Sequence, residues 1–364
     1  MAKYTNAERV FRALQRKEPD RVPHFEIIID PKVRNDILPG SSYEKFVDFM
    51  DIDALVNHER DMIAEEVISG NPRVIRDEWG VVKRYTREYA PIPIESEAPI
   101  KIEQDLERYK PPNPDEERRY DQLRRWASLY KGERAIIAMV LEPSTVVSDI
   151  MGFSNWLTCF YSKPELVKCV NQIVLNYKLR YINNAISAGA DIAWIGGDWA
   201  YKNGPMFSIE HFNQFVYPAF KACVDEAKKR GVYVLQHSDG NCWSFLDKII
   251  KAGVDCFHPI DPLAGMDIGE VKQKYGSKLC LMGNVNCATT LTTGTLEEVR
   301  NETKEVIRKA GYGGGLIVSS SNSIHQSVKP ENYVAMLETI HKYGTYPLER
   351  HFDNLVVPGS GKWS

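Results

Sequence analysis

The sequence predicts an α/β protein, a TIM-type (β/α)8 barrel with an N-terminal helical extension. Short, continuous apolar runs recur along the chain, and helical segments follow most of them, as in repeated strand–helix units. Polar residues cluster where these runs end, which is typical of the carboxyl ends of barrel strands. No GxGxxG motif opens a helix after a first strand, which argues against a dinucleotide-binding sheet.

The clearest strand–helix–strand unit lies between residues 231 and 262. Its two apolar runs, Val232–Gln236 and Val254–His258, flank a helical stretch, Trp243–Ala252, that ends at Gly253. Continuous rather than alternating apolar residues are typical of parallel strands buried on both faces. We therefore expect the polar residues that follow each run to face an active site.

The first 130 residues are expected to decorate the barrel and to supply a lid-like excursion. A helix is predicted over Ala7–Gln15, with Asn6 as its N-cap, and a strand is predicted to follow Pro23. The remaining elements expected here are short helices within residues 30–75, including Tyr43–Met50, a hairpin over residues 77–89, a surface excursion over 90–115 and a charged helix over Glu116–Lys131. Long excursions often act as lids or rims of a site. We expect residues 1–364 to form one barrel domain.

After residue 134 the alternation of strands and helices becomes regular. Strands are predicted over Ala135–Leu141, which ends at Glu142, and over Ala190–Ile195, which ends in two glycines. Helices are predicted over Met151–Phe160, Lys163–Ala188, Ser208 to Arg230 and Val328–Tyr343. The predicted strands lie near residues 22, 135, 190, 232, 254, 279 and 315, and an eighth has no clear position. A repeat this regular favours an eight-fold barrel over an open sheet.

The composition argues against several functional classes. The chain has 46 Lys and Arg against 49 Asp and Glu, a net charge of −3, and no block of like charges. This balance gives no support to nucleic-acid binding or to a basic membrane surface. No apolar run is long enough to span a bilayer and the start lacks a signal-peptide core, so we expect a cytoplasmic protein without a membrane partner. Seven scattered cysteines without a CxxC pair indicate reduced thiols.

Polar residues at the predicted strand ends would converge on one cavity at the barrel mouth. Glu26 stands inside an apolar run, where a carboxylate is costly unless it is paired, so we expect it to point into a polar cavity. We expect catalytic roles for His237, Asp239, Glu142, Glu26 and Asp198. We expect substrate contacts from Trp199, His258, Asn284, Asn322 and His325.

Several of these residues can also be explained by a purely structural role. Asp239 and Asn241 flank a glycine and are typical turn formers, and for Asn241 the turn is the better explanation. Asp198 is in a position to cap the segment that follows it. His258 also fits a buried core histidine whose hydrogen bonds are satisfied, and His325 fits a solvated loop residue. Trp199 and other aromatic residues fit a core or a rim as well as an apolar substrate pocket.

The same residue types suit a metal ion. A catalytic zinc takes Cys, His or carboxylate ligands and keeps one position open. His237, Asp239 and either Glu142 or Glu26 from neighbouring strands form such a set, and we take His237, Asp239 and Glu142 as the candidate ligands. A site without a metal, where Glu and His transfer protons, fits these residues equally well.

The sequence resembles the uroporphyrinogen decarboxylase superfamily in four segments: NAERVFRALQRKEPDRVP near the start, DEWGVV at 77–82, VYVLQHSDGN at 232–241 and VKPENYVAMLETIHKYG at 328–344. The resemblance runs from about residue 5 to residue 345. It implies a TIM-type barrel, in agreement with the predicted strands. The superfamily divides into true decarboxylases and corrinoid-dependent methyltransferases, so the resemblance leaves two activities to compare.

The chain departs from both of the better-defined branches. True decarboxylases carry an arginine-rich segment after the first strand, whereas HFEIIIDPKV here places Glu26 there, which would repel a polycarboxylate tetrapyrrole. Thiol-methylating members bind zinc through a His-x-Cys pair and a distant Cys. Here the matching positions are His237, Asp239 and the serines at 319–321, so that kind of thiolate zinc site is not expected.

With these two branches set aside, the sequence resembles the methyltransferases that act on O- or N-methyl donors, including the methoxyarene O-demethylases of anaerobic bacteria. This resemblance implies a small-molecule methyl donor and a partner protein whose corrinoid (cobalamin) cobalt accepts the methyl group, with zinc as a further candidate cofactor. An aryl ether oxygen leaves poorly unless it is protonated or bound to a Lewis acid, which His237 and Asp239 would provide. The alternatives are a decarboxylase or lyase acting on a small carboxylated substrate, and a non-catalytic binding protein. A homodimer is also expected, since barrels of this family often pair.

Overall fold

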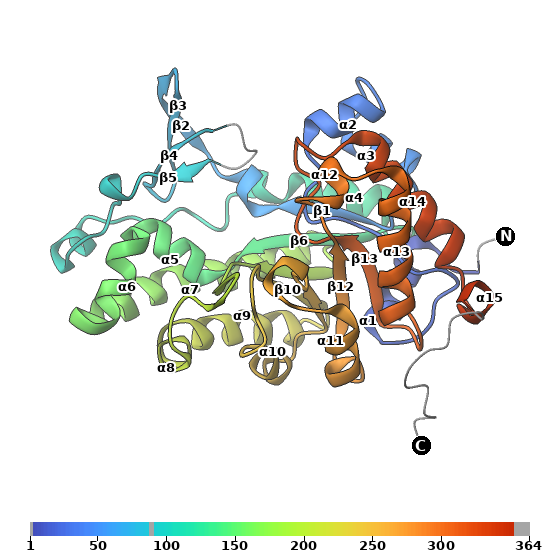
Figure 1. Ribbon diagram of the computed structural model, residues 1–364. Helices are drawn as coiled ribbons and strands as arrows, with labels where there is room; N and C mark the ends of the chain where they lie inside the picture. The colour runs from blue at the N-terminus through green and yellow to red at the C-terminus, as the bar shows by residue number, and fades with distance from the viewer. Residues whose placement is uncertain (1–2, 87–90, 353–364) are drawn as a thin grey trace.

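The computed structural model describes residues 3–86 and 91–352. A curled sheet of seven parallel strands forms its centre, in the order β1-β6-β7-β10-β11-β12-β13, and helices cover the outside of the sheet (Figure 1). The strands are β1 (Ala54–His58), β6 (Ala135–Leu141), β7 (Ile192–Gly196), β10 (Tyr233–His237), β11 (Cys256–His258), β12 (Cys280–Val285) and β13 (Leu316–Ser320). Nearly all of their residues are buried, as expected of strands covered on both faces. The predicted α/β barrel class is confirmed.

The segment between β13 and β1 takes the eighth place without forming a regular strand. Val318 N donates to Pro23 O at 3.0 Å and Asp53 N donates to His24 O at 2.9 Å, so the segment contacts both neighbours. Proline has no N–H to add to a ladder, and Ser320 N donates to the Glu26 side chain instead of to a backbone carbonyl. The prediction of a regular strand after Pro23 was therefore wrong, although the predicted place of this segment in the barrel was right.

Strand β1 corrects the prediction that residues 30–75 form only short helices. Helices α2 (Pro31–Ile37) and α3 (Tyr43–Phe49) are present as expected, but Ala54–His58 pairs in parallel with β6. Only three apolar residues precede Asn57 in this strand. A run that short carries no usable periodicity, which explains why the eighth strand had no clear position.

A four-stranded antiparallel sheet projects from the barrel (Figure 1). It contains β2 (Glu65–Gly70), β3 (Arg73–Asp77), β4 (Val82–Arg84) and β5 (Ile92–Pro93). The β3–β4 pair matches the hairpin predicted over residues 77–89, of which residues 87–90 lie outside the described residues. Strand β2 again replaces an expected helix. The excursion after β5 carries two short 3-10 helices, Glu95–Glu97 and Glu103–Glu107.

The helices follow the predicted order with shifted ends. The first helix is capped by Thr5 rather than Asn6, because Thr5 and Glu8 exchange hydrogen bonds in a capping box. A break at Gly152, with φ of +76°, divides the helical region predicted to begin at Met151. The longer helices are α1 (Asn6–Leu14), α4 (Asp121–Tyr130), α5 (Pro143–Met151), α6 (Phe153–Ser162), α7 (Pro164–Ser187), α9 (Tyr217–Lys229), α10 (Leu246–Ala252), α11 (Ile268–Tyr275), α13 (Leu296–Ala310) and α14 (Pro330–Tyr343).

Short elements complete the described chain. These are helices α8 (Ile209–His211), α12 (Thr290–Thr293) and α15 (Glu349–Phe352), the small strands β8 (Ala200–Tyr201) and β9 (Gly204–Pro205), 3-10 turns at Glu117–Tyr120 and Pro262–Ala264, and a π-helical turn at Phe212–Val216. Within the described ranges, no helix has both the length and the apolar character that crossing a bilayer requires. All seven cysteines are free thiols, which fits the absence of a disulfide framework in the sequence.

Candidate active site at the carboxyl ends of the strands

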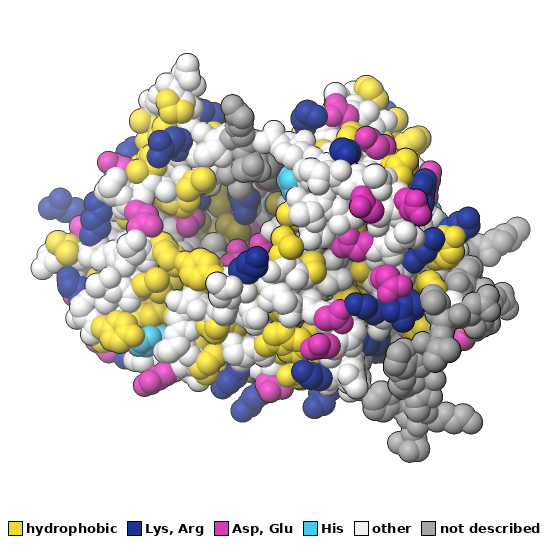
Figure 2. All heavy atoms as spheres, in the orientation of Figure 1, with side chains coloured by type: hydrophobic (Ala, Val, Ile, Leu, Met, Phe, Trp, Pro, Cys, Tyr) yellow, Lys and Arg dark blue, Asp and Glu magenta, His cyan; other side chains and the backbone are white. Residues whose placement is uncertain are grey.

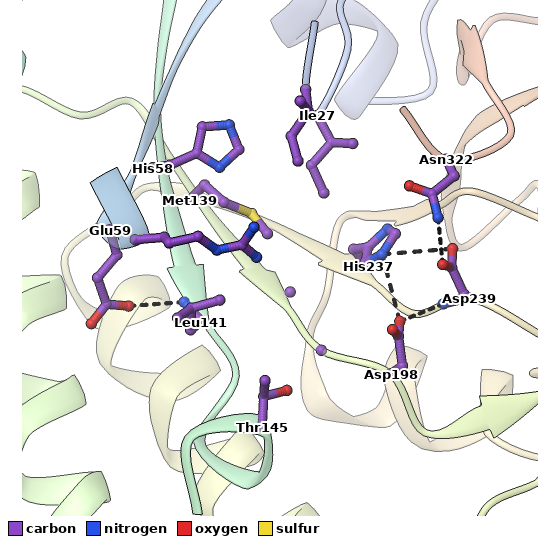
Figure 3. Close-up of a pocket in the computed structure, with 14 residues that line it drawn as sticks. Ile27, His58, Glu59, Met139, Leu141, Thr145, Asp198, His237, Asp239 and Asn322 are labelled. Atoms are coloured by element: carbon purple, nitrogen blue, oxygen red, sulfur yellow. Dashed lines mark hydrogen bonds and ion pairs between the residues drawn. The ribbon is translucent and has the colours of Figure 1, made fainter. Parts of the chain in front are cut away.

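A cavity of about 200 Å³ lies where β1, β6, β7 and β10 end. Figure 3 shows Asp198, His237 and Asp239 grouped on one side of it and His58 and Glu59 on the other. The molecular surface is hollowed between the β2–β5 sheet and helix α2 (Figure 2). Polar groups at the ends of parallel barrel strands are the usual position of an active site.

Strand register brings the residues of this cavity onto one face. His237 lies opposite Gly196 of β7 and His258 of β11, and neighbours in register point to the same side of a parallel sheet. A Cβ added at Gly196 would lie 2.1 Å from Met139 Cε, and one at Gly197 would lie 2.4 Å from Thr145 Oγ1. The two glycines are therefore needed for the neighbouring side chains to pack against this part of the wall.

His237 is the centre of an acidic cluster. Its Nε2 lies 3.6 Å from Asp198 Oδ1 and 3.7 Å from Asp239 Oδ1, and its Nδ1 lies 2.8 Å from His258 Nδ1. Backbone and side-chain donors fix the two carboxyl groups: Asp239 N donates to Asp198 Oδ1 at 2.8 Å, and Asn322 Nδ2 donates to Asp239 Oδ2. The structure thus brings together four of the predicted residues and His258 behind them.

Burial favours the neutral forms within this cluster. It lowers the pKa of His237, which the Asp198 charge opposes, and burial together with His237 lowers the pKa of His258 well below its usual value. Burial raises the pKa of Asp239 well above its usual value, and the nearby Asp198 and Asp261 carboxylates raise it further. These shifts favour the protonated form of Asp239 and the neutral form of the His237 ring, which suits a general acid.

The same cluster can hold a metal ion. Asp198, His237 and Asp239 each offer one ligand atom, and the three atoms lie within 4.8 Å of one another. The buried Oδ1 of Asp239 has no hydrogen-bond partner within the described ranges, as expected of an oxygen placed to be a ligand. An imidazole nitrogen and two carboxylate oxygens suit zinc and would leave a fourth position open. Asp198 therefore takes the role of third candidate ligand that the sequence had suggested for Glu142.

Glu142 and Glu26 lie outside this cluster, in the walls behind the cavity. Glu142 caps α5: its Oε2 accepts Ser144 N at 2.7 Å and also the Ser144 hydroxyl. Glu26 accepts Ser320 N at 2.8 Å and Ser320 Oγ at 2.6 Å. Burial raises the pKa of Glu26 to about 8 and the pKa of Glu142 to about 7. The expectation that Glu26 points into a polar cavity is corrected, because its carboxyl group binds the backbone of β13.

Of the remaining residues predicted to contact the substrate, one lines the cavity and others lie elsewhere. Asn322 lines the cavity, whereas Trp199 is fully buried among Phe212 and Phe245, in a core cluster of aromatic rings. Asn284 donates to Ile260 O at 3.0 Å and lines a different depression beside α13. His325 Nε2 lies 3.2 Å from Cys287 O, outside the cavity. The structure therefore places Trp199, Asn284 and His325 away from the cavity wall.

The wall formed by β1 and the 3-10 turn after it (Glu59–Met62) was missed in the sequence. It contributes His58, Glu59 and Arg60 to the cavity. The Glu59 carboxylate accepts two contacts of 2.7 Å from Lys178 Nζ on α7 and a hydrogen bond of 2.8 Å from Leu141 N. A signal was present, since NHER directly follows an apolar run, but the run was too short to predict a strand.

A parallel α/β barrel that collects ionisable side chains at its strand ends has the architecture of an enzyme. The sequence profile of the family described as Uroporphyrinogen decarboxylase (URO-D) matches residues 86–343. The chain belongs to this family. It is 24% identical over 358 residues to a uroporphyrinogen decarboxylase of Alkalilimnicola ehrlichii, covering 92% of this chain and 93% of that one. A uroporphyrinogen decarboxylase of Geobacter metallireducens is also 24% identical, over 70% of this chain and 74% of that one.

Solved structures with the same fold are more distant in sequence. A methyltransferase from Methanosarcina mazei superposes with a TM-score of 0.71 at 17% identity, over 94% of this chain and 99% of that chain. A B12-independent methionine synthase from a Shewanella species superposes with a TM-score of 0.50 at 10% identity, over 92% of this chain and 96% of that one. These two similarities concern the fold alone.

Proposed function

We propose that this protein is a methyltransferase that moves a methyl group from an O-methyl donor, such as a methoxyarene, to the corrinoid cobalt of a partner protein. The observation that carries this proposal is the Asp198–His237–Asp239 cluster on the cavity wall. The fold shared with a methyltransferase from Methanosarcina mazei supports the same class of reaction.

Because an ether oxygen is a poor leaving group, the protein must supply an acid or a Lewis acid to activate it. Displacement of a methyl group from an aryl ether is slow unless the ether oxygen is protonated or bound to a Lewis acid. Burial and the Asp198 charge raise the pKa of Asp239, which favours its protonated form and suits it to donate a proton to the departing oxygen. The proton that Asp239 gives up is replaced from solvent, and His237 Nε2 lies 3.7 Å from the Asp239 Oδ1 atom that takes part in this exchange.

Zinc bound in the same cluster would supply a Lewis acid for that oxygen. Asp198, His237 and Asp239 would be its ligands, with the fourth position left for the substrate. Asn322 would keep Asp239 oriented through the hydrogen bond to its Oδ2, and His258 would fix the ring of His237 through Nδ1. Both modes use the same three side chains, so substitutions test them together.

The size of the cavity limits what can bind inside it. An engineered cavity of roughly 150 Å³ holds one benzene molecule, so about 200 Å³ suits a single substituted ring. A tetrapyrrole or a corrin ring is several times larger and would have to approach from the hollowed surface (Figure 2). We infer that the corrinoid is presented there by its partner protein, with the N-terminal decoration as part of the rim.

The charge of the cluster disfavours the decarboxylase alternative. The Asp198 carboxylate would repel the carboxylates of uroporphyrinogen, and Arg60 is the one Lys or Arg among the described cavity-lining residues. A decarboxylase or lyase acting on a small carboxylated substrate remains the second candidate, because the sequence relatives carry the decarboxylase name.

The decisive experiment is methyl transfer under anaerobic conditions. The purified protein is mixed with cob(I)alamin, or with a corrinoid protein from the same source, and a panel of methoxyarenes and methylamines, and methylation of cobalt is followed spectroscopically. We expect donor-dependent methylation that His237→Ala lowers by about 100-fold or more. His211→Ala, which removes a histidine at helix α8, should leave the rate unchanged.

Two results would contradict the proposal. Full activity of His237→Ala would remove the cluster from the chemistry. No methylation with any donor or corrinoid protein, together with cofactor-free release of carbon dioxide, would establish the decarboxylase alternative. Zinc content after dialysis separates the two catalytic modes, since Asp198→Asn and Asp239→Asn should each lower bound zinc if the metal is present.

A further inference from the structure

A second depression, of about 290 Å³, lies between helices α11 and α13, beside the end of strand β12. These three elements are neighbours on one side of the barrel (Figure 1). The depression is larger than the active-site cavity and shares no lining residue with it. The proposed methyl transfer makes no use of it, so its chemistry needs an explanation of its own.

Glu302 is the one carboxylate lining this depression that no cation neutralises within the described ranges. The other two acidic residues of the lining are paired, since Asp267 Oδ2 lies 2.6 Å from Lys309 Nζ and Glu305 forms an ion pair of 2.6 Å with a neighbouring arginine. Glu302 Oε1 accepts a hydrogen bond of 2.7 Å from Asn286 N, which fixes the carboxylate on α13. Its Oε2 has no partner in the part of the chain that the structure describes. One negative charge is therefore left for a ligand.

Asn284 offers a second acceptor in the same depression. The residue is only 6% exposed, and its Nδ2 donates to Ile260 O at 3.0 Å, which fixes the orientation of the amide. Among residues 3–86 and 91–352, no group donates to its Oδ1. A buried amide oxygen without a donor costs free energy unless water or a ligand supplies one. The depression thus presents two acceptors, one of them charged, to whatever fills it.

These acceptors favour an organic cation over a metal ion. Calcium and magnesium need several oxygen ligands gathered around one point. In the described ranges, the only group of three His, Cys, Asp or Glu ligand atoms within 4.8 Å of one another is the Asp198–His237–Asp239 cluster of the active site. Much of the remaining lining of the depression is apolar and suits an alkyl chain: Pro262, Met266, Ile268 and Val306.

We propose that this depression binds an aliphatic primary amine in its protonated form, with the ammonium group donating to Glu302 Oε2 and Asn284 Oδ1. An ammonium group has three N–H donors and no acceptor, which matches two acceptors and one uncompensated negative charge. The alkyl chain would lie against Met266, Ile268 and Val306. The site is separate from the proposed reaction, so the failure of one leaves the other standing.

Methyl NMR of the intact protein tests this site directly. The methionine methyl groups are isotope-labelled, and two of their signals are assigned with Met266→Leu and Met139→Leu. Met266 lines the depression, whereas Met139 lines the active-site cavity. We expect n-butylammonium to shift the Met266 signal in a saturable way and to leave the Met139 signal unchanged. The uncharged n-butanol, which has the same alkyl chain, should bind about 10-fold more weakly, because hydrogen bonds to a charged group are stronger.

A substitution on α13 tests the role of the charge. Glu302→Gln keeps a carbonyl oxygen to accept Asn286 N, so it should fold, and we expect it to bind n-butylammonium about 10-fold more weakly. Glu297→Gln, which changes an exposed carboxylate in the first turn of the same helix, is the matched control and should bind as the wild type does.

Four results would each overturn the proposal. These are equal binding of n-butylammonium and n-butanol by the wild type, unchanged binding in Glu302→Gln, no saturable shift of the Met266 signal, and a shift of the Met139 signal in its place. The comparison of the two ligands uses the wild type, so it remains decisive even where the Glu302→Gln variant fails to fold.

Discussion

His237 and His258 share a hydrogen bond of 2.8 Å between their Nδ1 atoms, which only one of the two rings can donate. If His237 donates, its Nε2 carries a lone pair toward Asp198 and Asp239 and can bind a cation or accept a proton. If His258 donates, the Nε2 of His237 carries the hydrogen. His258 therefore sets the state of the atom that faces the cavity, although it does not reach the cavity itself.

Replacement of His258 by Phe should test this relationship. The side chain keeps a similar size against the edge of Trp194 but cannot hold the Nδ1 of His237. We expect a 10- to 100-fold loss of zinc affinity or of methyl-transfer rate, roughly the effect of removing a group behind a metal ligand. Zinc content and the pH profile of the rate are the measurements, and wild-type values for both would show that His258 is only a core residue.

Replacement of Lys178 by Met should unfold the protein more easily. The Glu59 carboxylate would remain buried without its partner, which typically costs about 3–5 kcal/mol in free energy of unfolding. The double variant Lys178→Met with Glu59→Leu should recover much of that loss. Urea unfolding provides the measurement, and the exposed Lys168→Met is the control, with an expected change within about 0.5 kcal/mol. A double variant no more stable than the single one would contradict this explanation.

Glu26 should make stability fall as the pH rises. Burial raises its pKa from 4.5 to about 8, so the folded state holds a proton that the unfolded state releases between these two values. In that window the free energy of unfolding decreases by up to about 1.4 kcal/mol per pH unit from this one group. The stabilisation is complete below pH 4.5 and is lost as the pH rises through 8.

Glu26→Gln provides the comparison, because Gln resembles the protonated acid. Urea unfolding of both proteins from pH 5 to pH 8 should show a smaller decrease for the variant. Glu142, with a pKa of about 7, adds a decrease of the same sign to both proteins, so only the difference between them reports on Glu26. Parallel curves would mean that Glu26 is ionised in the folded protein.

Replacement of Gly197 by Ala should disturb the cavity wall. The added Cβ would lie 2.4 Å from Thr145 Oγ1 and 2.6 Å from Glu142 Cβ, so neighbouring groups must move. We expect a loss of about 1–3 kcal/mol in the free energy of unfolding, as for other overpacked sites, and weaker binding of a methoxyarene donor. Gly70→Ala, where a Cβ meets nothing within 4 Å, should change neither. An unchanged affinity in Gly197→Ala would show that this part of the wall adapts.

The part of the site that could be predicted came from residues next to strong strand signals. His237 and Asp239 follow the continuous apolar run of β10, and Asp198 follows β7, so their place at the strand ends could be read from the sequence. Arg60 was missed because β1, the strand that precedes its turn, has only three apolar residues before Asn57. Glu26 and Glu142 were placed at the correct strand ends, but no local pattern indicates whether a carboxyl group faces a cavity or binds neighbouring backbone N–H groups.

The sequence by itself determined the barrel class, the order of its strands and helices and most of their positions, since these follow from apolar runs and helix caps that lie close together in the chain. The tertiary structure decided which polar side chains meet. Register sets His237 beside His258 and Gly196, and the closing segment turns Glu26 toward Ser320. The partnership of Glu59 with Lys178 spans 119 positions of the chain. Such pairings depend on the folding of distant segments against one another, which short-range periodicity does not encode.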